Sequence, residues 1–220
     1  MLADHNLREI PLFRDLEQSE LVKLTQVIKE RRAPKGTYIV YAEDPGPSIM
    51  FLAQGKAKVT LNSSEGKEIV LYQLSKGEFF GEIAVLTGED RSANVVAMTD
   101  CRLFVLEAED FRKHLQDNAG LAWAIMKELA LRLRQASSKI GDLALYDVYR
   151  RVARTLKSLA KPMGQEPEEV FVIEDRPTHQ ELANMVGTSR EMVTRALKGL
   201  EEDACISIEN KQIIIRKMPV

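Results

Sequence analysis

The stretch THQELANMVGTSREMVTRALKGLEED, Thr178–Asp203, has the pattern of two short helices joined by a tight turn. Thr178 followed by Glu181 forms a capping box, which opens a helix. Gly187 suits the turn that ends this helix, and Ser189 is placed to cap the next one. Two short helices about a glycine-containing turn are typical of a helix-turn-helix.

The second helix, from Arg190 to about Leu200, separates apolar and polar residues on opposite faces. In this motif the start of the second helix enters the major groove, where Arg suits guanine and Glu accepts from the cytosine amino group. An ordinary solvated helix face is the alternative interpretation. We predict a DNA-binding surface formed by Thr178, His179, Gln180, Thr188, Ser189, Arg190, Glu191, Thr194, Arg195 and Lys198.

A second stretch, GEFFGEIAVLTGEDRSANVVA (Gly77–Ala97), is mostly apolar but contains Glu82 and Arg91. A buried charge is costly unless it is paired, so the sequence predicts either a Glu82–Arg91 salt bridge or a bound ligand. The Arg91 guanidinium suits two phosphate oxygens, Ser92 adds a hydroxyl, and Glu82 can accept from a sugar hydroxyl. The predicted nucleotide site consists of Gly81, Glu82, Ile83, Ala84, Arg91 and Ser92.

Around this site, from Gly36 to Phe111, short β-rich runs alternate with turn residues. That spacing predicts a sandwich or a barrel-like roll. An amphipathic helix is expected before it, in DLEQSELVKLTQVI. The segment from Leu121 to Val148 has no proline and a helical pattern, so it predicts a helix about 40 Å long.

This long helix carries apolar or small residues at spacings that alternate between four and three. Such spacing is the seam of a two-helix coiled coil and favours a homodimer, although a helix lying on its own domain's core is the alternative. The predicted seam consists of Ala122, Met126, Leu129, Leu133, Ala136, Ile140 and Leu143.

The composition and the motifs that are missing argue against several classes of protein. Hydrophobic residues make up 45% and charged residues 29% of the 220 residues, as in ordinary globular proteins. No apolar run is long enough for a membrane span, and no secretory signal is visible, so we expect a cytoplasmic protein with no membrane partner. Two distant cysteines predict no disulfide framework and no metal site. No nucleotide-hydrolysing or zinc-protease motif is present, which favours binding without catalysis. A net charge of −2 leaves DNA binding open, because a local basic face is sufficient.

With these motifs the sequence resembles the CRP/FNR family, the cyclic-AMP receptor and fumarate–nitrate regulators of bacteria. FGEIAVLTGEDRSANVVA looks like the family's phosphate-binding cassette, and GTSREMVTRALKGLEED is similar to its recognition helix. The resemblance implies an α+β fold with an N-terminal cyclic-nucleotide-binding, jelly-roll-like β-roll, a long dimerisation helix and a C-terminal winged helix-turn-helix. The implied ranges are 1–117, 118–146 and 147–220.

The resemblance also implies roles for individual residues. Glu82 would bind the ribose 2′-hydroxyl, and Arg91 with Ser92 the cyclic phosphate. Where the cyclic-AMP receptor has two adjacent hydroxyl residues that contact the adenine, this chain has Ala136 and Ser137. One hydroxyl is missing, so cyclic AMP is expected but cyclic GMP or a cyclic dinucleotide stays open.

The implied function is that of a homodimeric transcription regulator which recognises a TGTGA-like inverted repeat on double-stranded DNA. RNA polymerase is an expected partner, with the segment 161–169 as a candidate contact. Two alternatives remain: a regulator that is independent of cyclic nucleotides, and a cyclic-nucleotide-binding regulatory subunit of an enzyme.

Overall fold

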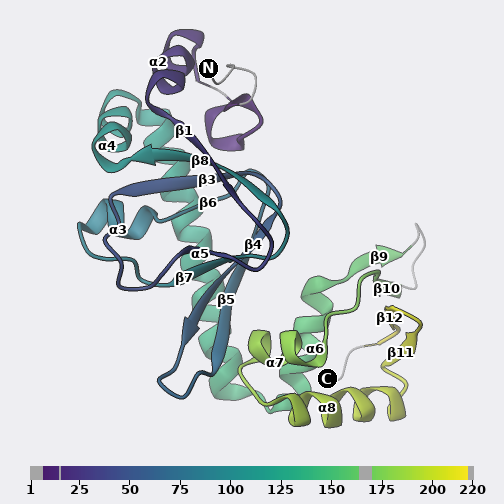
Figure 1. The fold of residues 1–220 in the computed structure, drawn as a ribbon. Coiled ribbons are helices and arrows are strands. Elements are labelled where there is room, and N and C mark those ends of the chain that lie inside the picture. Colours follow the sequence, from purple (N-terminus) through teal and green to yellow (C-terminus); the bar gives the residue numbers. More distant parts are fainter. Residues whose placement is uncertain (1–6, 15, 164–169, 218–220) are drawn as a thin grey trace. The chain divides into compact units, whose positions relative to one another are not determined.

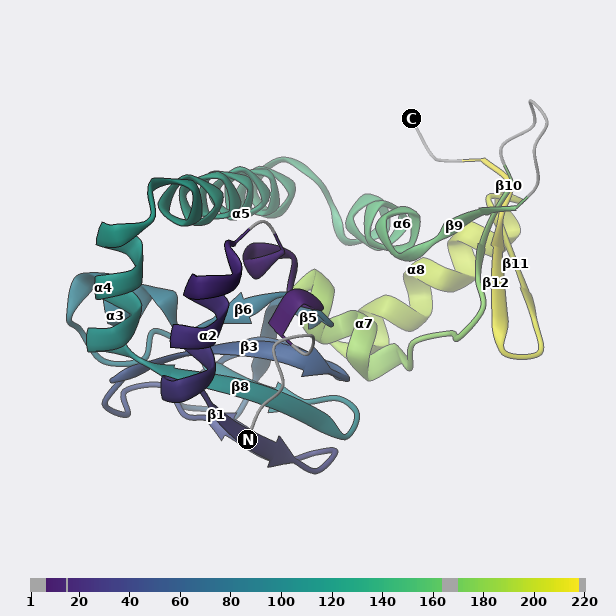
Figure 2. The same ribbon diagram turned by 90° about the horizontal axis from the view of Figure 1, so that it is seen from above.

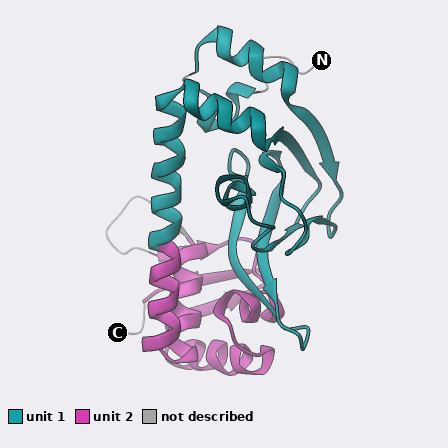
Figure 3. Ribbon diagram, turned by 90° about the vertical axis from the view of Figure 1, so that its left-hand side faces the viewer, with its two compact units in different colours: residues 1–134 teal, residues 135–220 magenta. Residues whose placement is uncertain are grey.

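The computed structural model describes residues 7–14, 16–163 and 170–217. The chain divides into two compact units, Met1–Arg134 and Gln135–Val220 (Figure 3). Each unit has its own hydrophobic core, and each is described by itself below.

Two four-stranded antiparallel sheets form the body of the first unit (Figure 1). Their orders are β1-β8-β3-β6 and β2-β7-β4-β5. The strands are β1 (Lys29–Ala33), β2 (Tyr38–Val40), β3 (Ser48–Gln54), β4 (Lys56–Asn62), β5 (Glu68–Ser75), β6 (Phe79–Phe80), β7 (Asn94–Ala97) and β8 (Cys101–Glu107). The predicted roll is confirmed, although β1 and β6 were not expected. Strand β1 (KERRA) has no alternating hydrophobic pattern, because it is an edge strand whose first four residues are exposed.

Strand β3 shows how the two sheets and the helices share the core of the first unit. Its alternate residues point to opposite faces, as in any strand. Ile49 and Phe51 pack into a cluster with the N-terminal helices, whereas Met50 and Leu52 pack between the two sheets. The helices of this unit are η1 (Pro11–Phe13), α2 (Gln18–Val27), α3 (Glu82–Thr87) and α4 (Ala108–Asp117). The long helix α5 (Ala119–Leu145) begins in this unit and continues into the second one.

Helix α5 confirms the predicted long helix, shifted toward the N-terminus by two or three residues at each end. Asp147 ends the connection that follows, because its side chain accepts from the Arg150 N–H and caps helix α6. Among the described residues no helix combines the length and the hydropathy needed to cross a membrane.

The second unit packs three helices against a small antiparallel sheet of order β11-β12-β10-β9, which lies near the C-terminal end of α8 (Figure 2). Buried residues of α6, α7 and α8 meet apolar residues of the sheet in one core. The hairpin predicted in CISIENKQIIIRK is confirmed. The elements are α6 (Val148–Leu159), β9 (Lys161–Met163), β10 (Val170–Ile173), α7 (His179–Val186), α8 (Arg190–Glu202), β11 (Ile206–Glu209) and β12 (Gln212–Ile215).

Candidate functional site

Gly81 stands at the start of the short helix α3, between β6 and the loop that carries Arg91. Its φ is +84°, a conformation that residues with a side chain rarely adopt. A Cβ built here would lie 2.1 Å from Nη1 of Arg91 and 3.0 Å from the Ser48 carbonyl oxygen. The sequence therefore needs glycine for two reasons, the backbone conformation and the close approach of Arg91.

Arg91 is a buried arginine, only 6% exposed. Its guanidinium donates to the Gly81 carbonyl and to the Ser48 hydroxyl, both at 3.2 Å. Among the described residues no carboxylate forms an ion pair with it. Burial lowers the pKa of Arg91, and the carboxylates of Glu82 and Asp44 oppose that shift. A guanidinium buried with neutral hydrogen-bond partners is suited to receive an anion.

Glu82 is 2% exposed and pairs with Arg132 of α5 at 3.1 Å, not with Arg91. The Glu82–Arg91 salt bridge that the sequence left open is therefore not formed. Arg132 also donates to the Phe79 carbonyl at 2.7 Å and to Glu128 at 3.1 Å. Burial raises the pKa of Glu82, and the positive charge of Arg132 opposes this. Sequence reasoning missed Arg132, because its partner lies fifty positions away and only the local Glu128–Arg132 spacing marked it.

Tyr72 completes the surroundings of this ion pair from β5. Its hydroxyl lies 3.5 Å from Nη1 of Arg132, and the Arg132 guanidinium sits 5.3 Å from the centre of its ring. Burial, reinforced by the Glu82 carboxylate, raises the pKa of Tyr72 to about 12. Like an ordinary phenol, it is protonated at neutral pH and has a proton to donate.

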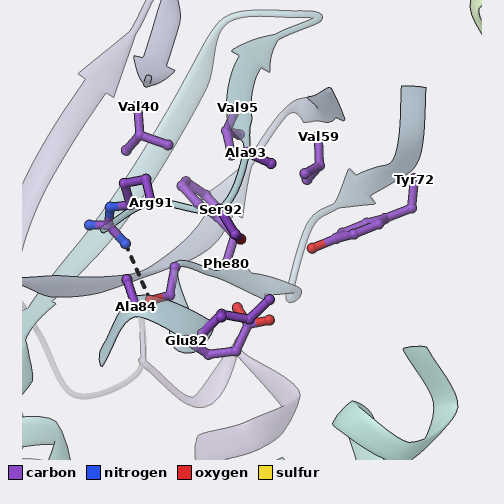
Figure 4. Close-up of a pocket in the computed structure, with 12 residues that line it drawn as sticks. Val40, Val59, Tyr72, Phe80, Glu82, Ala84, Arg91, Ser92, Ala93 and Val95 are labelled. Atoms are coloured by element: carbon purple, nitrogen blue, oxygen red, sulfur yellow. Dashed lines mark hydrogen bonds between the residues drawn. The ribbon is translucent and has the colours of Figure 1, made fainter. Parts of the chain in front are cut away.

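The six cassette residues predicted from the sequence all line one pocket. Figure 4 shows Arg91 at one end of it, Tyr72 at the other, and Ser92 and Glu82 between them. The cavity measures about 30 Å³, enough to hold a water molecule. The full lining is Val40, Val59, Tyr72, Phe80, Gly81, Glu82, Ile83, Ala84, Arg91, Ser92, Ala93 and Val95. Ala136 and Ser137 lie on the part of α5 that belongs to the second unit, so their role toward a ligand stays a prediction.

The predicted helix-turn-helix is formed by α7 and α8. The Thr178 hydroxyl accepts from the Glu181 N–H while the Glu181 carboxylate accepts from the Thr178 N–H, which is the predicted capping box. Gly187 ends α7 with a φ of +72°, and the Ser189 hydroxyl accepts from the Met192 N–H at the start of α8. These local signals were readable from the sequence because each acts within a few residues.

Helix α8 buries one face and exposes the other, as predicted. Val193, Ala196, Leu197 and Leu200 are buried in the core of the second unit. The exposed members of the predicted surface are Thr178, Gln180, Ser189, Arg190, Glu191, Thr194, Arg195 and Lys198, while His179 and Thr188 are partly buried. Bonds to its own backbone N–H and to Ser189 lower the pKa of Glu191, so this carboxylate stays ionised at the helix start.

Both halves of the chain match known domain families. Residues 30–118 match the model of the cyclic nucleotide-binding domain, and residues 150–220 match that of the Crp-like helix-turn-helix domain. The cAMP-activated global transcriptional regulator Vfr of Pseudomonas aeruginosa is 33% identical over 202 residues, which cover 89% of this chain and 92% of Vfr. The chain belongs to the CRP/FNR family of transcriptional regulators. As such it is a DNA-binding regulator and not an enzyme.

Other CRP/FNR proteins support the same assignment. The cAMP-activated regulator CRP of Salmonella typhimurium is 34% identical over 83% of this chain and 87% of that protein. The solved structure of the c-di-GMP-responsive regulator CLP of Xanthomonas campestris superimposes with a TM-score of 0.77 at 26% identity, covering 92% of this chain and all of CLP. The catabolite activator protein of Thermus thermophilus is 31% identical, with a TM-score of 0.55 over 94% of each chain.

Helix α5 carries the residues of the predicted dimer seam. Met126, Leu133, Ile140 and Leu143 of the predicted seam are exposed, Leu133 by 69%, and so is Ala136. Ala122 and Leu129 are partly buried, and Leu129 packs against the core of the first unit. Trp123, which the predicted seam did not include, is 70% exposed.

Within the described residues no group of three or more His, Cys, Asp or Glu is placed to hold a metal ion.

Proposed function

We propose that this chain is a cyclic-nucleotide-responsive, homodimeric transcription regulator of the cytoplasm. The observation that carries the proposal is the meeting of Gly81, Glu82, Arg91 and Ser92 in one pocket. The capped helix α8, which exposes Arg190 and other charged side chains, is the proposed DNA-binding element. An anionic ligand suits this pocket, because Arg91 is buried there without an ion-pair partner among the described residues.

In the proposed complex Arg91 and Ser92 bind the cyclic phosphate and Glu82 accepts from the ribose 2′-hydroxyl. Arg132 holds Glu82 to α5, so a ligand that engages Glu82 also acts on the middle of this helix. The ligand shifts the protein only by its difference in affinity between two arrangements of the chain. Some DNA binding without ligand is therefore compatible with the proposal.

Cyclic AMP is the proposed effector, because the relatives Vfr and CRP are both described as cAMP-activated. A second candidate has an observation in its favour. Ala136 removes one of the two hydroxyls that the family resemblance leads us to expect, and CLP, which shares the fold, is described as c-di-GMP-responsive. Cyclic GMP and a cyclic dinucleotide therefore belong in the same binding experiment.

For DNA we propose a TGTGA-like half-site repeated in inverted orientation. Arg190 and Arg195 offer guanidinium groups suited to guanine, and Glu191 suits the cytosine amino group. Two copies of α8 read such a repeat only if the chain is a dimer, which the exposed apolar residues of α5 support. RNA polymerase is the proposed further partner; of its candidate contact segment, residues 164–169 lie outside the described part of the chain.

Fluorescence anisotropy on a labelled TGTGA–N6–TCACA duplex tests the proposal at fixed salt, because such affinities depend steeply on salt. The protein is titrated without ligand, then with cyclic AMP, cyclic GMP or cyclic di-GMP, and against a scrambled duplex. Specific binding that requires one nucleotide supports the proposal and names the effector. Specific binding indifferent to all of them leaves a ligand-independent regulator. Absence of specific binding with every nucleotide contradicts the proposed TGTGA-like half-site.

Replacing Arg91 with Ala tests the pocket directly. We expect nucleotide affinity to fall by about 1.5–3 kcal/mol, the scale of a hydrogen bond to a charged group. Isothermal titration calorimetry with cyclic AMP measures this loss, and Arg31→Ala, on the exposed edge strand β1, is the matched control. An Arg91→Ala protein that binds nucleotide as the unaltered chain does contradicts the proposed phosphate site.

A further inference from the structure

A relay of hydrogen bonds crosses the helix-turn-helix through the imidazole of His179. Nη2 of Arg176 lies 2.7 Å from Nε2 of His179, and Nδ1 of His179 lies 2.8 Å from the Thr194 hydroxyl. The Thr194 hydroxyl in turn donates to the Arg190 carbonyl at 3.0 Å. The backbone N–H of Arg176 donates to the Lys211 carbonyl in the hairpin turn. The relay thus joins the hairpin, the segment before α7 and the helix α8.

The chemistry of the groups fixes the direction of every bond in the relay. A guanidinium has only donors, so Nε2 of His179 accepts from Arg176 and carries no proton. A neutral imidazole then has its proton on Nδ1, which donates to the Thr194 oxygen. The Thr194 hydroxyl keeps its own proton for the Arg190 carbonyl. The relay is complete only while His179 is neutral in the Nδ1–H form.

Surrounding charges favour that neutral form. Burial lowers the pKa of His179, and the guanidinium groups of Arg176 and Arg190 lower it further. The nearby acid on its own helix, Glu181, is occupied by the capping box with Thr178. The hairpin contributes the Lys211 backbone carbonyl, which accepts a hydrogen bond from the Arg176 backbone N–H.

This inference rests on the proposed DNA binding by α7 and α8. We propose that His179 is a positioning residue, whose neutral imidazole holds the Arg176 guanidinium beside α8 so that Arg176 contacts a DNA phosphate. Thr194, a member of the DNA-binding surface predicted from the sequence, links His179 to the backbone of α8. Arg176 was not among the residues that sequence reasoning selected, because its partners follow it at distances of three and thirty-five residues.

The first arm of the test reads the imidazole without DNA. Nitrogen-detected NMR of the histidine rings in the full-length protein, with His179→Gln to assign the signal, reports tautomer and pKa. We expect the Nδ1–H form at neutral pH and a pKa below the free value of about 6.5. Arg176→Gln removes one positive neighbour and should raise that pKa. An Nε2–H tautomer, or a pKa that Arg176→Gln leaves unchanged, overturns the relay.

The second arm measures how duplex affinity depends on salt, with the TGTGA–N6–TCACA duplex and cyclic AMP present. Loss of one phosphate contact reduces the slope of log K against log salt by about 0.9. We expect this reduction per bound subunit in Arg176→Ala and equally in His179→Ala, which removes no charge at neutral pH. The double variant should lose no more than either single one.

Two variants serve as controls for this arm. His179→Gln keeps an acceptor for Arg176 and should largely retain the slope. Lys157→Gln removes a cation of α6 whose ammonium lies over the Phe171 ring, and should leave the slope unchanged. A His179→Ala slope equal to that of the unaltered protein overturns the positioning role. If the unaltered protein binds no duplex, the proposed function fails and the phosphate contact with it, whereas the tautomer shows separately whether the relay exists.

Discussion

Arg132 is the residue on which the buried carboxylate of Glu82 depends. It supplies the positive charge at 3.1 Å and also bonds the Phe79 carbonyl. Removing one partner of a buried pair leaves the other uncompensated, so Arg132→Met should destabilise the protein by about 3 kcal/mol at neutral pH. Urea unfolding measures this. Arg134→Met, which alters an exposed neighbour on α5, is the matched control.

The pH dependence of that loss follows from the sign of the Glu82 shift. Burial raises the pKa of Glu82, and without Arg132 only the bond from its own backbone N–H and the charge of Arg91 oppose the increase. The folded state then binds a proton that the unfolded chain releases above about pH 4.3, so stability falls as the pH rises through that value. The deficit of Arg132→Met should therefore be smaller at acid than at neutral pH. Glu82→Gln combined with Arg132→Met should recover part of it, and an equal deficit at both pH values contradicts the pairing.

His114 of α4 should make stability depend on pH in the opposite direction. Burial lowers its pKa, and the carboxylates of Asp110, Asp117 and Glu20 only partly oppose this. Below about pH 6.5 the unfolded chain takes up a proton that the folded protein refuses, so stability is lost as the pH falls. His114→Gln should flatten this part of the curve of urea midpoint against pH. Parallel curves for the two proteins would show that another group titrates.

At the scale of elements, α3 is bounded by two glycines of similar conformation but different surroundings. Gly81 and Gly88 have φ of +84° and +78°, yet a Cβ at Gly88 meets nothing within 4 Å whereas one at Gly81 collides with Arg91. Gly88→Ala should cost about 1 kcal/mol for the backbone alone. Gly81→Ala should cost more and should also weaken cyclic AMP binding, measured by calorimetry. Equal effects of the two variants would mean that Arg91 adapts freely.

Helix α5 exposes the apolar residues that the proposed dimer would bury. Met126, Leu133 and Ile140 recur every seven residues and are all exposed. Leu133→Glu places a charge in the middle of this row and should shift the dimer toward monomer in sedimentation velocity. Gln135→Glu, an exposed position two residues on, is the control. A dimer that tolerates Leu133→Glu assembles through another surface.

Interactions between residues close in the sequence could be predicted, whereas interactions between distant residues could not. The capping box of Thr178 and Glu181 and the turn at Gly187 are local, and the structure confirms them. The partner of Glu82 was not predictable, because many arginines stand at comparable separations and only the fold selects Arg132. Leu129 shows a third case. Its 4-3 spacing fits a seam, but packing against the core of the first unit takes part of its surface.

At the scale of the whole molecule, the two units have separate cores that are joined along the chain through α5. The clusters of the first unit and that of the second share no residue. Cores of this kind unfold as separate cooperative units when the connection between them is weak. We therefore expect two transitions in differential scanning calorimetry of the unliganded protein.

Ligands should then act on these transitions selectively. Cyclic AMP at 100 times its dissociation constant should stabilise the first unit by about 2.7 kcal/mol and raise only its transition by several degrees. The labelled duplex should raise the transition of the second unit. Arg91→Ala should abolish the first shift and leave that caused by an excess of the duplex. If cyclic AMP instead raises both transitions equally, the units unfold together, and the nucleotide then acts on a single cooperative structure that includes α8.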